Sequence, residues 1–508
     1  MFYVDLCGLF DYNHNQRGDK LKHYIAVDIG ASSGRAILSN IDNNQIKTQE
    51  INRFANGFTT QNQQEVWDVD YLFEEIIVSL KKAKAMGITE CYLSIDTWGV
   101  DYLFLDHKGK RLQNAVSYRD SRTDTTMDKL FNEVSKYDIF QKTGIQFLTF
   151  NTIYQLFEET HTLKDQARDI LLIPDYLNYL LTNKKRNEIT NLSTTQLLSV
   201  HDHSLDQALL TSIGIDKAQF PNTIEPGTYI GEINADLNIQ NDLPVTHVYA
   251  TASHDTASAV LGSVGDAFKK WAFLSSGTWS LIGKELESPI VTEKALELGY
   301  SNERGMNHTY RFLKNIIGMW IIQRIRKDWP ENYTFPEMVE EAKQHQDFKV
   351  YIDFNDQRFI NPDCMVDEIK NYCIQTNQTV PQTLGEIVQS VYMNLAIIYA
   401  ISIEELNEIT KEPIEVINIV GGGSNNDYLN ELTALYTNCD VIAGPTEATI
   451  FGNLAATMIG TGEFENIQEA RAVIKRSTDT TKIAKPELKH IANQDIKTFK
   501  GVTHYEYV

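Results

Sequence analysis

Residues 250–262 decide the fold, and they read ATASHDTASAVLG. An apolar strand ending in Val248 and Tyr249 leads into them, and their small residues are typical of a closely packed helix, which we expect to begin near Asp255. The N–H groups of a first helical turn favour a carboxylate, so we predict that Asp255 stays ionised and faces a ligand. Asp is also a common helix cap, which is the plain alternative at this position.

A second informative stretch follows at residues 273–281, which read FLSSGTWSL. It predicts a strand, a tight turn with hydroxyl groups and Gly277, and then another strand. A carboxylate beside such a turn suggests a base near a phosphate. The alternative is a helix cap followed by an ordinary hairpin.

The first half of the chain opens with a similar pattern at residues 24–38, which read YIAVDIGASSGRAIL. We predict a hairpin and not a P-loop, because no Gly-Lys-Ser/Thr follows. The small side chains of residues 31–34 let backbone N–H groups approach a phosphate. Asp28, at the strand end, is placed to hold Mg²⁺, directly or through water. A plain turn with a solvated Asp28 is the alternative.

Between these hairpins, residues 69–85 show helical spacing, and residues 91–96 predict a strand. That strand leads into a loop, residues 97–101, where Gly99 permits close approach of a ligand or of other backbone. Residues 118–122 carry two arginines among carboxylates. They could bind sugar hydroxyls, but a solvated ion-pair cluster is the more common outcome.

The second half predicts further elements around glycine turns. We expect a helix over residues 311–323, with Asn315 near its start, and a long helix over 381–406. Residues 416–426 predict a buried strand, a turn with three glycines and a helix from about residue 427. The glycines would let backbone lie against a planar ring or phosphates, although a tight strand-to-helix connection is the more common explanation of such a run.

Composition limits the possible functions. A chain of 508 residues is too long for one compact core, so two or more domains are expected. The net charge of −22 argues against nucleic-acid binding. We expect no transmembrane helix, because no apolar run approaches the length of a membrane span. The five cysteines are scattered, which is typical of reduced thiols in a cytoplasm. A disulfide between Cys364 and Cys373 is the minority interpretation. The sequence has no cluster of His and Cys residues with the spacing of metal ligands, so we do not expect zinc.

Taken in order, these motifs match the actin/Hsp70/sugar-kinase superfamily, and over residues 24–475 the chain closely resembles the FGGY carbohydrate kinases. The motifs that carry the resemblance are residues 27–35, 95–101, 118–122, 151–156, 253–256, 275–280, 313–315 with Gln323, and 420–423. The resemblance implies an α/β fold of two ribonuclease-H-like (actin-like ATPase) domains with an interdomain ATP cleft. It divides the chain into an N-terminal extension (1–23), a sugar-binding domain (24–264), a nucleotide-binding domain (265–475) and a C-terminal tail (476–508).

The resemblance also implies the roles of individual residues. Asp255 is similar to the catalytic base of the family, and Asp28 lies near the expected Mg²⁺. The expected ketose contacts are Gly99, His254, Asp255 and Thr256. The expected ATP contacts are Ala31, Ser32, Ser33, Gly34, Arg35, Thr278, Asn315, Gln323, Gly421, Gly422 and Gly423. His254 either binds a sugar hydroxyl or packs to fix Asp255.

The first turn, Ala-Ser-Ser-Gly-Arg, resembles the version found in the subgroup that acts on L-rhamnulose. This implies phosphoryl transfer from ATP to the C1 hydroxyl of that ketose in the cytoplasm, by a monomer or homodimer without nucleic-acid or membrane partners. The alternatives are another FGGY kinase for fuculose or xylulose, a non-kinase ATPase of the same fold, and a sugar-binding regulator without catalysis.

Overall fold

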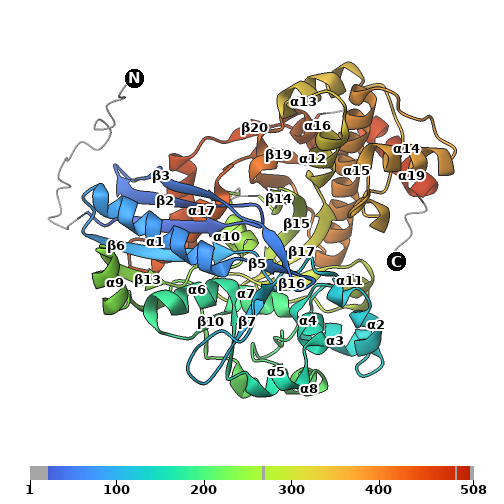
Figure 1. Ribbon diagram of the computed structural model, residues 1–508. Coiled ribbons are helices and arrows are strands. Elements are labelled where there is room, and N and C mark those ends of the chain that lie inside the picture. Colours follow the sequence, from blue (N-terminus) through green and yellow to red (C-terminus); the bar gives the residue numbers. More distant parts are fainter. Residues whose placement is uncertain (1–20, 266–268, 487–488, 504–508) are drawn as a thin grey trace.

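The computed structural model describes residues 21–265, 269–486 and 489–503 (Figure 1). The predicted N-terminal extension, residues 1–23, lies almost entirely outside these described residues. A six-stranded sheet organises the first half of the chain. Its strands, in spatial order, are β12 (Tyr229–Glu232), β13 (Val245–Tyr249), β6 (Glu90–Thr97), β1 (Tyr24–Ile29), β2 (Ser33–Asp42) and β3 (Gln45–Ala55).

A seven-stranded sheet organises the second half. Its strands, in spatial order, are β16 (Ser301–Arg304), β17 (Tyr310–Ile317), β15 (Trp279–Leu286), β14 (Trp271–Ser276), β18 (Val416–Val420), β19 (Asp440–Ala443) and β20 (Thr481–Ile483). Each sheet has an antiparallel hairpin followed by two parallel strands: β1 and β2 with β6 and β13, and β14 and β15 with β18 and β19. The predicted repetition of one α/β plan in both halves is confirmed.

Side chains alternate between the two faces of the first sheet, as strand geometry requires. Ile25 and Val27 of β1 enter one apolar cluster, with α1 (Val69–Ala85) and α6 (Ile173–Thr182). Tyr24 and Ala26 enter another, with α17 (Ala448–Gly460) from the second half. Residues of the second half therefore cover the far face of the first sheet.

Helix α10 (Asp255–Leu261) begins at Asp255, as predicted. It contacts α17 and the first strand of the second sheet, β14, and the two helices lie between the sheets (Figure 1). Gly262 and Gly452 lie where α10 and α17 cross. A Cβ atom on Gly452 would overlap the carbonyl oxygen of Ser258, and one on Gly262 would overlap that of Ala448. The backbones of the two helices are therefore in direct contact.

The second sheet is covered on its other face by the long helix α15 (Leu384–Thr410), close to the predicted range. By length and hydropathy α15 would qualify as a membrane span, so the expectation that no apolar run approaches one was wrong, but 94% of its apolar window is buried inside the protein. It is therefore a core helix. The helices that contact it are α12 (Trp320–Asp328), α13 (Phe335–Gln344), α16 (Asp427–Thr437) and α19 (Lys489–Thr503), and α14 (Met365–Gln375) packs on α12.

The remaining elements are mainly short and link these layers. The first half adds β4 (Phe58–Gln61), β5 (Gln64–Trp67), β7 (Tyr102–Leu105), β8 (Ala115–Val116), β9 (Asp169–Leu172), β10 (Asn187–Glu188), β11 (Thr223–Ile224), α2 (Thr126–Phe131), α3 (Lys136–Thr143), α4 (Thr152–Glu158), α5 (His161–Gln166), α7 (Ile189–Leu192), α8 (Gln207–Ser212) and α9 (Ala235–Asn241). The second half adds α11 (Glu293–Glu297) and α18 (Ile467–Ser477). Cys364 and Cys373 are free thiols, so they do not form a disulfide.

Two further segments differ from the sequence prediction. Residues 310–317 form strand β17, and the helix begins only at Trp320, because β15 and β16 pair with this segment on both sides. Asn315 is therefore a strand residue. The predicted tail, residues 476–508, supplies β20 to the second sheet and α19 to its helical layer, where Asp495 of α19 accepts hydrogen bonds from Tyr351 and Tyr436.

Candidate active site

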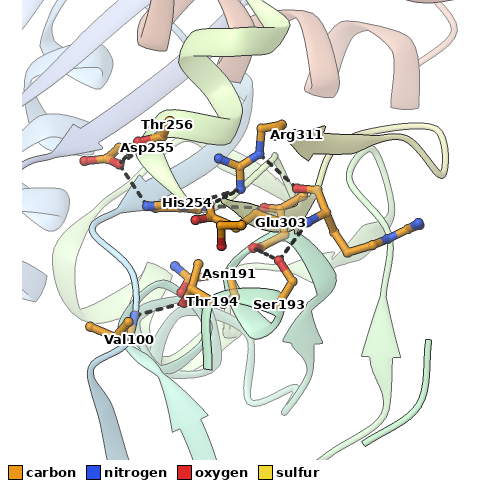
Figure 2. A network of polar contacts seen from close by, with 12 residues as sticks. Val100, Asn191, Ser193, Thr194, His254, Asp255, Thr256, Glu303 and Arg311 are labelled. Atoms are coloured by element: carbon orange, nitrogen blue, oxygen red, sulfur yellow. Dashed lines mark hydrogen bonds and ion pairs between the residues drawn. The ribbon is translucent and has the colours of Figure 1, made fainter. Parts of the chain in front are cut away.

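Asp255 is placed by the junction between β13 and α10. The chain after β13 continues alongside the end of β6, where Thr97 N–H donates to the Ser253 carbonyl at 2.9 Å. His254 is the N-cap, with an extended backbone, and Asp255 is the first helical residue. Its Oδ1 accepts hydrogen bonds from the backbone N–H of Thr256 at 2.6 Å and from its hydroxyl at 3.2 Å (Figure 2). Thr256 therefore orients the carboxylate.

Burial is the largest influence on the pKa of Asp255. Burial raises the pKa of Asp255, His254 and the Thr256 hydrogen bonds lower it, and the negative charge of Asp28 raises it again, with a net rise from the ordinary value. The side chain nevertheless keeps 34% exposure, so it can be reached by a ligand. A carboxylate with a raised pKa is a better proton acceptor than an ordinary Asp.

His254 and Gly99 lie together beside Asp255. His254 Nε2 is 3.4 Å from Asp255 Oδ1. A Cβ atom on Gly99 would lie 3.4 Å from the same Nε2 and 3.0 Å from Thr194 Oγ1. Thr194 also accepts the N–H of Val100 at 3.1 Å, which ties the loop after β6 to this corner (Figure 2). The four predicted ketose contacts are thus brought to one place by segments far apart in the sequence.

Two further carboxylates face Asp255 from the first sheet. Asp28 and Asp96 are register neighbours on the parallel strands β1 and β6. Asp96 is fully buried, and its Oδ2 accepts a 2.5 Å hydrogen bond from Asn453 of α17, while its Oδ1 has no hydrogen-bond partner among the described residues. Burial, and then the charge of Asp28, raise the pKa of Asp96 well above its ordinary value.

This environment can accept a divalent cation. Mg²⁺ prefers one or two carboxylates together with waters and substrate phosphates, and the pair Asp28 and Asp96, with one unpartnered buried oxygen in the described part of the chain, has that chemistry. The described residues contain no group of three or more His, Cys, Asp or Glu side chains able to hold a metal alone. Waters and ATP phosphates would therefore complete the coordination.

The first hairpin turn is open to solvent. Ser32 and Ser33 are exposed, whereas Gly34 is buried, and a Cβ atom on Gly34 would overlap the ring of Phe54. Arg35 Nε and Nη2 donate to Asp28 Oδ2 at 3.1 and 3.0 Å, and Arg35 also forms an ion pair with Glu447, just before α17. Arg35 thus connects the two halves of the chain beside the turn.

The second hairpin turn lies against the glycine run. Gly421 has a φ of +82°, and a Cβ atom on Gly423 would overlap the Ser276 hydroxyl of β14. Gly422 faces open space, since a Cβ atom there would meet no described atom within 4 Å, and Gly277 is exposed. Thr278 sits in the turn and is half-buried. Two predicted ATP motifs from distant parts of the sequence therefore share one edge of the sheet, because β14 and β18 pair in parallel.

The other predicted nucleotide residues lie on β17 and α12. Asn315 Nδ2 donates to Gln146 Oε1 at 2.8 Å, so its side chain contacts a segment of the first half. Gln323 is exposed on α12. Their roles toward ATP stay predictions.

Of the charged residues around Gly99, some are largely buried and hydrogen-bonded and one is exposed. Asp101 is buried and accepts hydrogen bonds from Trp67, Trp98 and Gln155 at 2.7, 2.9 and 3.0 Å, and burial raises its pKa to about 6. Arg122 donates to Gln155 at 2.8 Å. Both side chains contact Gln155, which links them. The Arg122 side chain is only 15% exposed and lies 3.9 Å from Glu159, so it is not part of the solvated ion-pair cluster that the sequence favoured for residues 118–122. Arg119 is exposed, with its guanidinium 5.2 Å from the ring centre of Tyr118.

A buried carboxylate, Glu188, was not singled out from the sequence. Its Oε2 accepts hydrogen bonds from Ser253 N and Oγ at 3.0 and 2.6 Å, so it fixes the backbone immediately before His254. It belongs to a polar run, residues 187–196, that is buried throughout. Such a run looks like a solvated loop in sequence, and only its unusual density of Thr, Asn and Gln distinguishes it. Glu303 and Arg311, which also contact His254, were likewise missed.

Two related α/β halves, with a carboxylate at a helix start between glycine-rich hairpin turns, define an actin-like phosphotransferase fold. The N-terminal domain model of the FGGY family of carbohydrate kinases matches residues 23–262, and the C-terminal domain model of that family matches residues 272–461. The chain therefore belongs to the FGGY family of carbohydrate kinases, which are ATP-dependent sugar kinases.

Individual relatives agree with this assignment. A protein of Bacillus subtilis (strain 168) named Rhamnulokinase is 50% identical over 454 residues, which cover 89% of this chain and 93% of that protein. A Rhamnulokinase of Ligilactobacillus salivarius (strain UCC118) is 45% identical over 96% of this chain and 98% of its own length.

Solved structures share the fold at low sequence identity. Xylulose kinase from Lactobacillus acidophilus superposes with a TM-score of 0.79 at 17% identity, over 96% of this chain and 99% of that one. Glycerol kinase from Plasmodium falciparum with ADP gives 0.75 at 14% identity, over 96% and 99%. At this identity the likeness shows the fold alone.

Proposed function

We propose that the chain transfers the γ-phosphoryl group of ATP to the C1 hydroxyl of L-rhamnulose, giving L-rhamnulose 1-phosphate and ADP. The observation that best supports a ketose kinase is that Gly99 and His254 lie beside Asp255, whose side chain is partly buried but still accessible. The choice of L-rhamnulose is supported by relatives that carry the name Rhamnulokinase at 45–50% identity.

In this mechanism Asp255 accepts the proton of the C1 hydroxyl while the hydroxyl oxygen attacks the γ-phosphorus in line, and the bond from that phosphorus to the ADP oxygen breaks. Positioning and charge stabilisation provide most of the acceleration in such transfers. The backbone of residues 31–34 and Thr278 would hold the phosphates. Asp28 and Asp96 would hold Mg²⁺, which when bound neutralises phosphate charge.

The same proposal assigns the remaining partners and the place of action. A ketose and ATP are the partners, the reaction takes place in the cytoplasm, and residues 24–264 and 265–475 form the sugar-binding and nucleotide-binding domains. Asn315, Gln323 and the glycines 421–423 complete the nucleotide site. Exposure of Gly422 and Gly277, which leaves their backbone open to a ligand, supports this placement.

A substrate panel tests the proposal. ADP release with Mg-ATP is measured across L-rhamnulose, L-fuculose, L-xylulose, D-xylulose and glycerol, and L-rhamnulose is expected to give the highest kcat/KM. A missing or misplaced hydroxyl at a hydrogen-bonding site costs a large factor in kcat/KM. A preference for another ketose would overturn the substrate but not the kinase, and the absence of sugar-dependent ADP release would overturn both.

The raised pKa of Asp255 predicts a pH dependence of activity. Because only the deprotonated carboxylate accepts a proton, kcat/KM should fall as the pH drops through the pKa of Asp255 in the free enzyme. The midpoint of this acid limb should lie above about 3.9, the value of an unperturbed Asp. The measurement is kcat/KM for the ketose at Mg-ATP far below its KM, where free enzyme predominates, across the stable pH range, with a direct control that the coupling enzymes are not limiting. Activity that stays constant down to an ordinary aspartate pKa would contradict the burial argument.

A further inference from the structure

The buried ion pair of Glu303 and Arg311 reaches the sugar side of the site from the second sheet (Figure 2). The two residues are register neighbours on β16 and β17, and Glu303 Oε2 lies 2.9 Å from Arg311 Nη2. Their side chains are 8% and 0% exposed. Removing two charges from water costs free energy, so a buried ion pair is weak evidence of a role in stability. The position of this pair beside the site therefore calls for a functional explanation.

Both members of the pair converge on one atom of His254. Nδ1 of His254 lies 3.3 Å from Glu303 Oε2 and 3.3 Å from Arg311 Nη2. The other ring nitrogen, Nε2, consequently faces Asp255 Oδ1 and the corner next to Gly99. The partner of one imidazole nitrogen fixes the ring orientation and decides what the other nitrogen presents.

The charge of Glu303 is secured by its surroundings. Burial alone would disfavour the carboxylate, but Arg311 and His254 outweigh burial and hold the pKa of Glu303 below its ordinary value. Arg311 is fixed in turn, because its Nε donates to the Arg304 carbonyl at 3.1 Å, and Arg304 N–H donates to Ser193 Oγ at 2.9 Å. The pair is therefore linked through Arg304 to Ser193 of the first half of the chain.

We propose that Glu303 and Arg311 are positioning residues for the ketose: they hold the His254 ring by Nδ1 so that Nε2 meets a substrate hydroxyl beside Asp255. This role rests on the proposed ketose kinase activity and deepens it. The sugar site, whose other members come from the first half, is then complete only when the second sheet lies in place.

A double-mutant cycle between Glu303 and His254 tests the role. Glu303→Gln removes the carboxylate charge that lies 3.3 Å from His254 Nδ1. It is expected to raise the KM for the ketose about tenfold, the size of one lost polar contact. The KM for ATP should not change, and kcat should stay within about threefold, since uniform binding is lost rather than transition-state binding. In the His254→Asn background, Glu303→Gln should add no further rise in KM, because Glu303 acts through the ring. Additive effects on KM would overturn the proposal.

Glu405→Gln is the matched control. Glu405 of α15 forms a buried ion pair with Lys314, also on β17, at 3.1 Å, and its side chain is 2% exposed. This change should lower the thermal midpoint of unfolding as a broken buried pair does, but leave the ketose KM at the parent value. If Glu303→Gln fails to fold, Arg311→Lys replaces it. Lys keeps the charge but cannot reach both partners with one planar group, so the ketose KM should rise here too, and an unchanged KM would overturn the proposal.

A spectroscopic measurement separates this inference from the proposed function. The imidazole ¹⁵N resonances of the ligand-free protein, assigned to His254 by loss of signal in His254→Asn, report the Nδ1 hydrogen bond without any substrate. They should shift in Glu303→Gln and stay in place in Glu405→Gln. Unshifted resonances in Glu303→Gln would overturn the positioning role, whether or not the parent enzyme phosphorylates a ketose. A parent without ketose-dependent ADP release would overturn the proposed function alone.

Discussion

Replacing Asp255 by Asn is expected to lower kcat by about 10²–10⁴-fold, the usual loss when a general base is removed. Asn is close to Asp in shape, and its Oδ1 can still accept the hydrogen bonds from the backbone and hydroxyl of Thr256. Binding of ATP and of the ketose should therefore persist while turnover is lost. The measurement is steady-state ADP release together with ketose binding by calorimetry.

The same variant should lose activity but not stability. A folded-state pKa above the unfolded value means that the ionised Asp255 costs stability above that pKa and that protonation relieves the cost. Asn carries no charge, so Asp255→Asn should be at least as stable as the parent at neutral pH. Asp236→Asn, at an exposed position in the first turn of α9, is the control and should leave turnover unchanged. Near-normal turnover in Asp255→Asn would remove Asp255 from its assigned role.

Replacing Gly452 by Ala is expected to damage both folding and catalysis. The new Cβ would overlap the carbonyl oxygen of Ser258 and lie 2.8 Å from the N atom of Gly262, so α17 and α10 must separate. Overpacking of this kind costs about 1–3 kcal/mol in the free energy of unfolding. Helix α10 carries Asp255 at its first position, and a shift of about 1 Å at a reacting group can cost about 10²-fold in rate.

The measurement compares the thermal midpoint and kcat of Gly452→Ala with those of Gly501→Ala. Gly501 also lies inside a helix, α19, but a Cβ atom there meets no described atom within 4 Å. Gly501→Ala should therefore be neutral or stabilising by up to about 1 kcal/mol, as helix propensity predicts. If both variants behave alike, the contact between α10 and α17 does not control the position of Asp255.

Local sequence determined the tight turns and the start of helix α10. Small residues around Ser33 and Gly277 specify tight turns between apolar strands. The acidic residue Asp255 and the small residues after it favour the start of α10, because a carboxylate is stabilised in a first helical turn. The resemblance to the FGGY kinases, carried by these same turns, predicted the two-domain fold that the family models and solved structures confirm.

Strand partners that are distant in sequence decided the secondary structure of two segments that local patterns did not predict. Residues 310–317 look helical in isolation but form β17, since β15 and β16 offer hydrogen-bond partners on both sides. Residues 481–483 join the second sheet for the same reason. Strand formation depends on neighbours supplied by the rest of the fold, so propensity alone is overridden.

The electrostatic character of the candidate site also belongs to the tertiary structure. The sequence placed Asp255 at a helix start and predicted an ionised carboxylate, but burial and Asp28 raise its pKa. Nothing in the sequence indicated that Glu303 and Arg311, which come from the other half of the chain, lie against His254, or that Glu188 holds Ser253. Turns and caps follow from short-range sterics and hydrogen bonding, whereas the protonation and orientation of site residues depend on solvent exclusion and on charges that only the folded chain brings together.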